Sequence, residues 1–399
     1  MLIIADDLSG ALDTGVIFSG LTPTKVVLKL PKHLFDGPSV LAWTTESRHL
    51  PADEARRNLQ QVLPYPLKIR PLYKKVDATL RGPVGAEIET LLHLTGMKTA
   101  VLCPSFPTVN KIVKDGHLYV DGKPLETTAL GTDPRNPLRT GDIQALLRET
   151  TTLRAEYVSL NTLRHHPEHV HQSITRHSTG QIVVVDAETD DDLAQIAKIL
   201  SKHPNVLPCG SLALALQLRP YLVQSQTLTV PVTAKADKAL IMSASLHPAT
   251  QQQINYFRTR FPDHFWEIDS TLLSHHTPEL INTVTLRLID WFSTSHFALL
   301  SVSPEPRIDP NAVTAFLGQL AQRLINDMKG VFALAATGGD MTSALCRALG
   351  ITELEPVMQW EPGIVQSRML FRKSPWTLVS KSGSYGSAPF FIDFVRRLL

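Results

Sequence analysis

The chain has 399 residues, of which 43% are hydrophobic and 19% are charged, a composition typical of a globular protein large enough for two domains. Its 39 Lys and Arg residues nearly balance its 37 Asp and Glu residues, which argues against nucleic acid or an anionic membrane as partner and favours a small molecule. The chain starts with an apolar strand rather than a signal peptide, has no apolar run of about 18 residues and contains few cysteines, so we expect a cytoplasmic protein.

Short apolar runs alternate with helical patterns along the whole chain. In the first half, strands are expected at 2–5, 25–30, 39–43, 99–104 and 182–187, and helices at 86–94 and 191–202. In the second half, strands are expected at 239–243, 298–302, 331–336 and 376–380. This alternation predicts an α/β fold in which mainly parallel sheets are flanked by helices.

A domain boundary is expected in the stretch 218–239. It contains two prolines, has a polar middle without sustained periodicity, and precedes a new apolar strand. These features predict a first domain over residues 1–228 and a second over residues 229–399.

The first strand ends in two adjacent carboxylates, Asp6 and Asp7, within the sequence ADDLSG. Open α/β sheets bind their ligands at the carboxyl ends of strands, so this position favours a binding role. The structural alternative is that one carboxylate caps a helix starting near Ser9 while the other is solvated.

The strand at 39–43 leads into TTESRHL and places Arg48 at its exit. A guanidinium there offers a planar fork for a carboxylate, although an exposed surface arginine is the commoner occurrence. Its interest comes from lying at the same predicted edge as Asp6 and Asp7.

The segment YKKVDATLRG leads from a strand into a glycine-containing turn and then a helix. Its polar side chains are Lys74, Lys75, Asp77, Thr79 and Arg81. Cationic side chains and free backbone N–H groups around one turn favour anion binding. In the alternative interpretation, one lysine faces solvent and Arg81 only pairs with Glu87 or Glu89.

The run HHPEHVH at 165–171 is better explained by a turn and a helix start than by a metal site. Pro167 interrupts helical spacing and no cysteine lies near. The acidic run at 186–192 is interpreted as the start of a helix, where negative charge is favourable.

In the second half, the strand at 331–336 runs into Thr337, Gly338, Gly339 and Asp340 before a helix from about Met341. Glycines at a strand-to-helix turn let phosphate oxygens approach the backbone, and the helix start supplies N–H donors. Asp340 would then take a proton or hold a metal, unless it is only a helix cap. The later KSGSYG adds a second glycine turn suited to packing under a base or ribose.

Taken together, these segments resemble the four-carbon acid sugar kinase family, whose members phosphorylate threonate, erythronate or 3-oxo-tetronate with ATP. The resemblance runs over nearly the whole chain, in the order ADDLSGALDTGV, YKKVDATLRG with GAEIETLL, CPSFPTVNKIVKDGHLYVDGKPL, VVDAETDDDLAQIA, TGGDMTSALCRALG, EPGIVQSRM and KSGSYG.

The resemblance implies two domains with the active site in the cleft between them, the first holding the sugar acid and the second the nucleotide. Substrate-side positions are Asp7, Arg48, Lys75, Asp77 and Arg81, with Asp6 and Thr79 as further candidates. Nucleotide-side positions are Ser245, Gly338, Gly339, Asp340, Met341 and Gly383. Under this hypothesis, carboxylates bind substrate hydroxyls, Arg48 and the lysines bind its carboxylate, and ATP with Mg²⁺ is required. Asp340 is the candidate base, and the metal ligands are left unassigned.

The chain departs from the family pattern in several places. ASLHP at 244–248 replaces Gly-Ser-x-Ser-Pro, so Ala244 and His247 stand for a glycine and a serine. Ala78 replaces a serine in the segment that reads DATLRG, and GGDM and GSYG replace GGDT and GxFG. These changes affect the expected nucleotide contacts more than the fold, and either altered substrate choice or weak activity is compatible with them.

Two alternatives from other classes stay open at this point. One is a carboxylate-metal phosphohydrolase or receiver-like module built on Asp6 and Asp7, which would need a third carboxylate or a lone lysine at a later strand end. The other is a catalytically silent metabolite-binding protein of the same fold. The expected partners are a small sugar acid and ATP rather than nucleic acid or membrane, and a homo-oligomer stays open.

Overall fold

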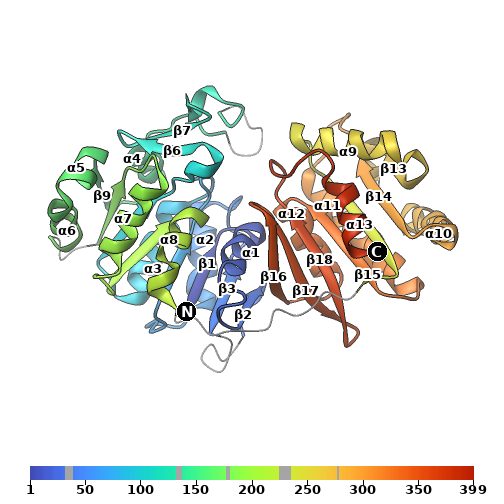
Figure 1. The fold of residues 1–399 in the computed structure, drawn as a ribbon, viewed down its shortest axis with the longest axis horizontal. Helices are drawn as coiled ribbons and strands as arrows, with labels where there is room; N and C mark the ends of the chain where they lie inside the picture. The colour runs from blue at the N-terminus through green and yellow to red at the C-terminus, as the bar shows by residue number, and fades with distance from the viewer. Residues whose placement is uncertain (32–38, 132–136, 177–179, 224–234, 276–277) are drawn as a thin grey trace. The chain divides into compact units, whose positions relative to one another are not determined.

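The computed structural model describes residues 1–31, 39–131, 137–176, 180–223, 235–275 and 278–399. The chain divides into two compact units (Figure 1): Met1–Pro23 with Leu30–Thr227, and Thr24–Lys29 with Leu228–Leu399. The expected boundary between residues 228 and 229 lies outside the described residues. Residues 24–29, which the sequence-based division places in the first domain, belong to the second unit.

The sheet of the first unit is parallel throughout its described strands. Their order is β3 (Val40–Thr44), β1 (Leu2–Ala5), β4 (Leu72–Lys75), β11 (Val206–Gly210), β5 (Thr99–Cys103), β10 (Gln181–Val185) and β9 (Arg154–Val158). Every residue of β1 is at most 1% exposed, so both faces of this strand are covered. Such burial explains the uninterrupted apolar run at the start of the chain.

Helices cover the sheet of the first unit. They are α1 (Leu8–Val16), α2 (Ala52–Val62), α3 (Val84–Thr95), α4 (Ile143–Arg148), α5 (Leu160–His165), α6 (Pro167–Thr175), α7 (Asp190–Leu200) and α8 (Leu212–Leu222). Helix α8 contacts both α1 and α7, while α3 contacts α2 and α4. The acidic run does begin a helix, because the Thr189 hydroxyl and the Asp192 carboxylate form a capping box at the start of α7.

A small antiparallel sheet, which the sequence patterns do not predict, projects from the first unit (Figure 1). It consists of β6 (Lys111–Lys114), β7 (His117–Val120) and β8 (Lys123–Pro124), with short 3₁₀ helices at Pro107–Val109 and Leu125–Thr127. The buried carboxylate of Asp186 accepts hydrogen bonds from the backbone of Asp115 and Gly116 at 2.9 and 3.0 Å. Asp186, at the start of the acidic run, therefore fastens the β6–β7 turn to the main sheet.

The second unit also has a parallel sheet, extended by antiparallel strands. The parallel part is β13 (Phe265–Ile268), β14 (Phe297–Val302), β12 (Lys238–Ser243), β15 (Phe332–Thr337) and β18 (Ser374–Lys381). The antiparallel part is β17 (Ile364–Phe371), β16 (Glu353–Glu361) and β2 (Thr24–Val27). The apolar run near residue 25 thus completes the sheet of the second unit. The mixed α/β fold expected from the sequence is confirmed.

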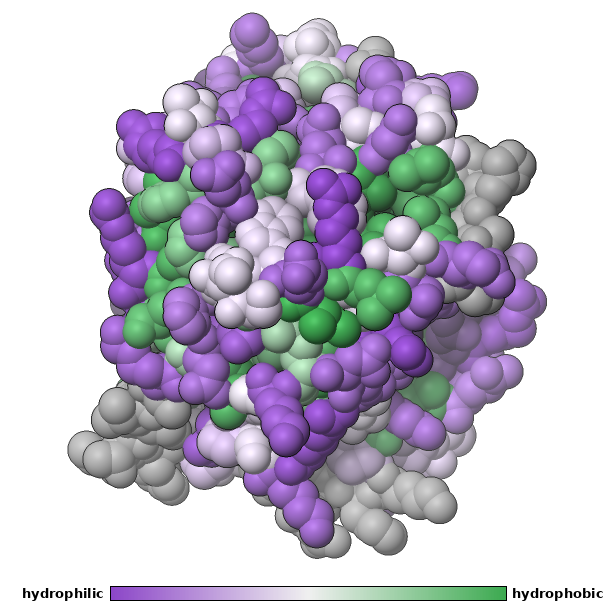
Figure 2. Space-filling model, turned by 90° about the vertical axis from the view of Figure 1, so that its right-hand side faces the viewer, coloured by the Kyte–Doolittle hydropathy of each residue, from purple (hydrophilic) through white to green (hydrophobic). Residues whose placement is uncertain are grey.

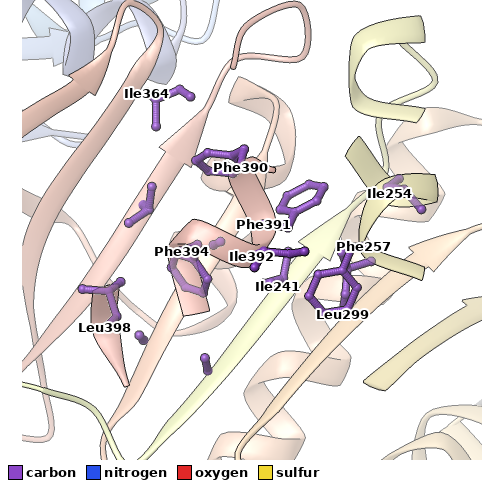
Figure 3. Close-up of a cluster of buried hydrophobic side chains, with 14 residues drawn as sticks. Ile241, Ile254, Phe257, Leu299, Ile364, Phe390, Phe391, Ile392, Phe394 and Leu398 are labelled. Atoms are coloured by element: carbon purple, nitrogen blue, oxygen red, sulfur yellow. The ribbon is translucent and has the colours of Figure 1, made fainter. Parts of the chain in front are cut away.

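Helices α9 (Pro248–Arg260) and α13 (Phe390–Leu398) pack on one face of this second sheet (Figure 3). Phe257 of α9 and Phe391 and Phe394 of α13 are at most 1% exposed and pack with Ile241 of β12 and Leu299 of β14. The remaining helices are α10 (Pro278–Thr294), α11 (Pro310–Asp327) and α12 (Gly339–Ala348), with 3₁₀ turns at Pro262–His264 and Ser270–His275. The sheet is covered on its other face too, because the alternate β12 side chains Leu240 and Met242 are fully buried.

Among the described residues, no helix has both the length and the apolar character needed to cross a bilayer. On the face shown in Figure 2, hydrophobic residues form separate patches between hydrophilic ones.

Candidate active site

Strands β1, β3 and β4 bring three polar segments to one edge of the first unit. Ala5, the last residue of β1, is paired with Thr44 of β3 and with Lys75 of β4. Because these strands are parallel and end together, Asp6 and Asp7, the segment 45–48 and the segment 76–81 follow at the same edge.

Arg48 and the two aspartates form a buried ion-pair cluster at this edge. The Arg48 Nε donates to Asp6 Oδ2 at 2.7 Å, and its Nη1 donates to Asp7 Oδ2 at 2.6 Å. Its Nη2 lies 3.9 Å from Asp77 Oδ1, beyond hydrogen-bond distance. The Arg48 side chain is 12% exposed and that of Asp6 is 1% exposed, so the cluster is largely shielded from water. Arg48 is therefore not a solvated surface arginine.

The two adjacent carboxylates have opposite pKa shifts. Burial favours the neutral form of Asp6, but the charges of Arg48 and Lys75 outweigh it and lower its pKa. Burial raises the pKa of Asp7, and the charge of Asp6 adds to this effect against the opposing charge of Arg48. The surroundings of these two neighbouring carboxylates thus move their pKa values apart. Such divergent pKa values are common at binding and catalytic sites.

Asp7 combines the two roles that the sequence left as alternatives. Its Oδ1 accepts from the backbone N–H of Gly10 at 2.8 Å and caps α1, while its Oδ2 binds Arg48. A Cβ atom at Gly10 would lie 2.8 Å from Asp7 Oδ1 and 3.1 Å from Lys75 Nζ, so a larger residue there would displace these two side chains. The expectation that the other carboxylate is solvated is wrong, because Asp6 is buried.

Asp77 organises the turn after β4. Its carboxylate accepts two hydrogen bonds from Arg81, each of 2.9 Å, and a further one from the Thr79 hydroxyl. Burial opposes ionisation of Asp77, but Arg81 and Arg48 hold its pKa well below the ordinary value. Arg81 therefore pairs with Asp77, and the alternative in which it pairs only with Glu87 or Glu89 is wrong.

Neither lysine of β4 faces solvent, contrary to the structural alternative drawn from the sequence. Lys74 is fully buried and its Nζ lies 2.9 Å from Glu87 Oε1 of α3, which is also fully buried. Lys75 is 7% exposed and its Nζ donates to the Val76 carbonyl at 2.8 Å. Only Lys75 therefore belongs to the polar edge, while Lys74 lies beneath it.

Two charged residues near this edge were not identified from the sequence. Burial raises the pKa of Asp13 in α1 to about 7, opposed by the charge of Lys75. Burial lowers the pKa of Lys111 in β6, opposed by the charge of Asp77. No local sequence pattern singles out Asp13 within α1, and Lys111 lies in the small sheet that sequence patterns missed.

A second polar edge occurs in the second unit. Ser243 of β12, Thr337 of β15 and Lys381 of β18 are paired in register, so the turns that follow these strands lie together. A Cβ added to Gly383 would lie 2.9 Å from the Ser245 hydroxyl, which shows how closely two of these turns approach.

Gly338 precedes α12 with φ of 96°, in a region that favours glycine, and a Cβ there would meet no atom within 4 Å. No side chain caps this helix at Gly338. The first turn begins at Gly339 and contains exposed Asp340 and buried Met341. The turn thus has open space beside Gly338 at the start of a helix, an arrangement suited to an anion. The capping position is Gly338, so the alternative in which Asp340 is the N-cap is wrong.

His247, one of the departures from the family pattern, caps α9. The backbone N–H of Ala249 donates to its Nδ1 at 3.2 Å. The imidazole therefore takes over the capping function that a serine hydroxyl serves in other helices.

Lys381 was missed by the sequence-based assignment. It is 1% exposed, and its Nζ donates to the Thr250 hydroxyl at 3.0 Å and to the Ser382 carbonyl at 3.1 Å. Burial lowers its pKa to about 7. A buried lysine at the end of a strand therefore ties the last glycine turn to α9.

The described residues contain no group of three or more His, Cys, Asp or Glu side chains arranged to hold a metal ion. In the histidine-rich run, α5 ends at His165 and α6 begins at Pro167, so the predicted turn and helix start are confirmed. Cys103, Cys209 and Cys346 are buried, and none of the three forms a disulfide bond.

Comparison with known proteins decides the family. A sugar-binding N-terminal domain model matches residues 1–218, and a nucleotide-binding C-terminal domain model matches residues 240–391. The chain belongs to the four-carbon acid sugar kinase family.

Curated members of this family match the chain over nearly its full length. A D-threonate kinase of Bordetella bronchiseptica is 29% identical, covering 98% of this chain and 95% of its own. A D-threonate kinase of Salmonella typhimurium is 26% identical, covering 98% of this chain and 97% of its own. A D-erythronate kinase of Heliobacterium modesticaldum is 26% identical, covering 97% of this chain and 94% of its own.

The fold also occurs among solved structures. A crystal structure of a Salmonella typhimurium LT2 protein superposes with a TM-score of 0.77 at 21% identity, covering 100% of this chain and 99% of its own.

Proposed function

We propose that this protein transfers the γ-phosphoryl group of ATP to a hydroxyl of a four-carbon sugar acid of the threonate, erythronate or 3-oxo-tetronate type. The observation that carries the proposal is the buried cluster in which Arg48 joins Asp6 and Asp7 beside Asp77. Relatives named as D-threonate and D-erythronate kinases over nearly the whole chain support the same reaction.

The polar edge of the first unit has the groups that a hydroxylated acid needs. Carboxylates accept hydrogen bonds from hydroxyls, and Asp6, Asp7 and Asp77 supply them. The Nε and Nη1 of Arg48 are already used by Asp6 and Asp7, so its Nη2 is the part of the fork that remains for a substrate carboxylate. In this proposal, Lys75 and Arg81 add positive charge near that carboxylate.

The polar edge of the second unit fits phosphate groups. The α12 N-terminus offers backbone N–H donors, and the open space beside Gly338 lets a phosphate approach the backbone. The nearby turns at Ser245 and Gly383 complete the proposed nucleotide side. ATP would supply the transferred phosphoryl group.

Asp340 is proposed as the group that takes the proton from the substrate hydroxyl. It is an exposed carboxylate in the first turn of α12. A carboxylate so close to a phosphate site would repel its ligand unless it accepts a proton or helps to hold Mg²⁺. Because no three-ligand protein cluster occurs among the described residues, Mg²⁺ would take most of its ligands from phosphate oxygens and water.

A metal-dependent phosphohydrolase built on Asp6 and Asp7 is less well supported. The third carboxylate that it would need is present as Asp77. However, each of these carboxylates accepts hydrogen bonds from an arginine, which leaves them poorly disposed to ligate a metal.

The proposal is tested by measuring ADP release with D-threonate, L-threonate, D-erythronate and 3-oxo-tetronates. The four-carbon sugar alcohols threitol and erythritol are matched controls, because they carry hydroxyls but no carboxylate. We expect turnover with at least one acid and turnover at least about 100-fold slower with the alcohols, since the alcohols lack the carboxylate that Arg48 Nη2 is proposed to bind. ATP-dependent turnover by none of the acids would contradict the proposal and favour a silent metabolite-binding protein.

A further inference from the structure

A buried carboxylate that the proposed reaction does not use lies beneath the Arg48 loop, residues 45–48. Glu87, in the first turns of α3, is fully buried, as is its partner Lys74 of β4. Its Oε1 lies 2.9 Å from Lys74 Nζ and accepts from the hydroxyls of Ser47 at 2.8 Å and Thr45 at 3.3 Å. One carboxylate oxygen therefore joins β4, α3 and the Arg48 loop.

The same loop is fastened to β1 by its backbone. The N–H groups of Ser47 and Arg48 donate to the Asp6 carbonyl at 3.0 and 3.3 Å, and that of Thr45 donates to the Ala5 carbonyl at 2.8 Å. The single proton of the Thr45 hydroxyl is shared between Glu87 Oε1 and the Ala5 carbonyl, 3.0 Å away, and its oxygen also lies 2.7 Å from the Ser47 hydroxyl. The side chains of Thr45 and Ser47 thus point down to Glu87, while that of Arg48 reaches Asp6 and Asp7.

The negative charge of Glu87 strengthens its hydrogen bonds to the Arg48 loop. Hydrogen bonds to an ionised carboxylate are about twice as strong as those between neutral groups. Lys74 supplies the compensating charge without which a fully buried carboxylate would be costly. Glu46, between the two anchored hydroxyls, has a positive φ of 50°, a backbone conformation that must be maintained by its surroundings.

We propose that Glu87, paired with Lys74, is a positioning residue that holds Arg48 in its binding orientation through the hydroxyls of Thr45 and Ser47. The inference rests on the proposed function for the contact between Arg48 and the acid. Glu87 and Lys74 touch no substrate in this account, so their effect on the reaction passes through the Arg48 loop.

Ser47→Ala tests the inference in the full chain, because it removes one loop anchor and leaves the Lys74–Glu87 pair intact. We expect KM for the acid to rise about 5- to 10-fold, with kcat and KM for ATP nearly unchanged. In an Arg48→Ala background the same substitution should add nothing, since the two residues act as one unit. An unchanged KM, or an equal increase in both backgrounds, would overturn the inference.

Thr99→Val is the matched control. Thr99 is a buried hydroxyl that donates to the Ile174 carbonyl at 2.9 Å, at the start of β5 and thus at the opposite edge of the sheet. Its loss should affect stability without selectively changing KM for the acid.

Hydrogen exchange supplies a readout that does not depend on turnover. The amides of Ser47 and Arg48 should exchange at least about 10-fold faster in Ser47→Ala and Glu87→Gln than in the wild type or Thr99→Val. If the wild type phosphorylates no acid, the proposed function fails, and the exchange rates still decide whether Glu87 fixes the loop. Wild-type turnover with unchanged exchange in both variants overturns the positioning role alone.

Discussion

The Nε of Arg48 lies 2.7 Å from Oδ2 of the buried Asp6, so the arginine most suited to a substrate carboxylate already binds a carboxylate of the protein. Arg48 therefore has two functions in this account. It neutralises the charge of adjacent aspartates, and it presents its remaining Nη2 group to the substrate.

Replacement of Arg48 should consequently affect stability and binding together. Arg48→Ala leaves buried carboxylates without a counter-charge, which typically costs about 3–5 kcal/mol of unfolding free energy. It should also raise KM for the acid far more than it lowers kcat, corresponding to about 2–3 kcal/mol for a lost charge-assisted contact. Urea unfolding and steady-state kinetics at a temperature where the variant is folded measure the two effects.

Arg56→Ala is the control for this variant. Arg56 also forms ion pairs in the first unit, with Asp53 at 3.2 Å and Glu89 at 3.0 Å, but its partners are more exposed. It should cost about 1 kcal/mol or less and leave KM unchanged. An Arg48→Ala enzyme with wild-type KM would remove Arg48 from the binding site.

Asp13 should make the protein less stable as the pH rises from about 4 to about 7. Burial raises its pKa to about 7 in the folded protein, against an ordinary value of 3.8, so the folded state binds more protons than the unfolded state in this window. Asp13→Asn removes this dependence and should stabilise the protein at pH 8 by on the order of 2 kcal/mol, with little effect at pH 4.

Urea unfolding at pH values from 4 to 8 measures this difference. The control Asp191→Asn replaces an exposed carboxylate in the first turn of α7. A difference in unfolding free energy between the wild type and Asp13→Asn that does not grow from pH 4 to pH 8 would contradict a raised pKa for Asp13.

The lowered pKa of Lys381 should make the protein more stable as the pH rises above about 7, the opposite of the effect of Asp13. Burial lowers its pKa to about 7 from 10.5, so between these values the unfolded state binds the extra proton and stability rises with pH. The stability of the wild type relative to Lys381→Met should therefore increase between pH 7 and pH 10. The control Lys329→Met, at an exposed position of the same unit, should show no such trend; a flat difference for Lys381→Met would mean that Lys381 stays charged.

The sequence predicted which residues meet at the first polar edge because strand ends of a parallel sheet converge. Asp6, Arg48, Lys75 and Asp77 are brought together in this way. The ion pairs among these residues could not be predicted. Arg48 was expected to bind only a substrate carboxylate, whereas it binds Asp6 and Asp7 of its own chain.

Other features depend on contacts that no local pattern records. The Lys74–Glu87 pair joins a strand and a helix. Adjacent lysines in a strand point to opposite faces, so one was expected to face solvent, but this holds only for a sheet with one open face. The pairing of β2 with β16 links segments more than 300 residues apart along the chain, so the run near residue 25 was assigned to the first domain. Strand β16 is partly exposed, and the mixed pattern of its residues gave no clear strand signal.

Asp340→Asn distinguishes the roles proposed for this carboxylate. The substitution keeps the shape of the side chain, so a base role predicts kcat falling by about 100-fold or more with nucleotide affinity nearly intact. A role in holding Mg²⁺ predicts a steeper Mg²⁺ requirement and weaker ATP binding instead. Initial rates over a range of Mg²⁺ and ATP concentrations separate the two, and normal turnover at ordinary Mg²⁺ would direct the search for the base to Asp6, Asp7 and Asp77.

Phosphorus NMR of the enzyme incubated with ATP, Mg²⁺ and each four-carbon acid tests the central claim most directly, because it separates transfer to the acid from hydrolysis of ATP. The account predicts a new phosphomonoester signal with at least one of the acids, formed in step with ADP and absent when either ATP or the acid is omitted. Formation of ADP and inorganic phosphate alone, or no reaction with any of the acids, would contradict it.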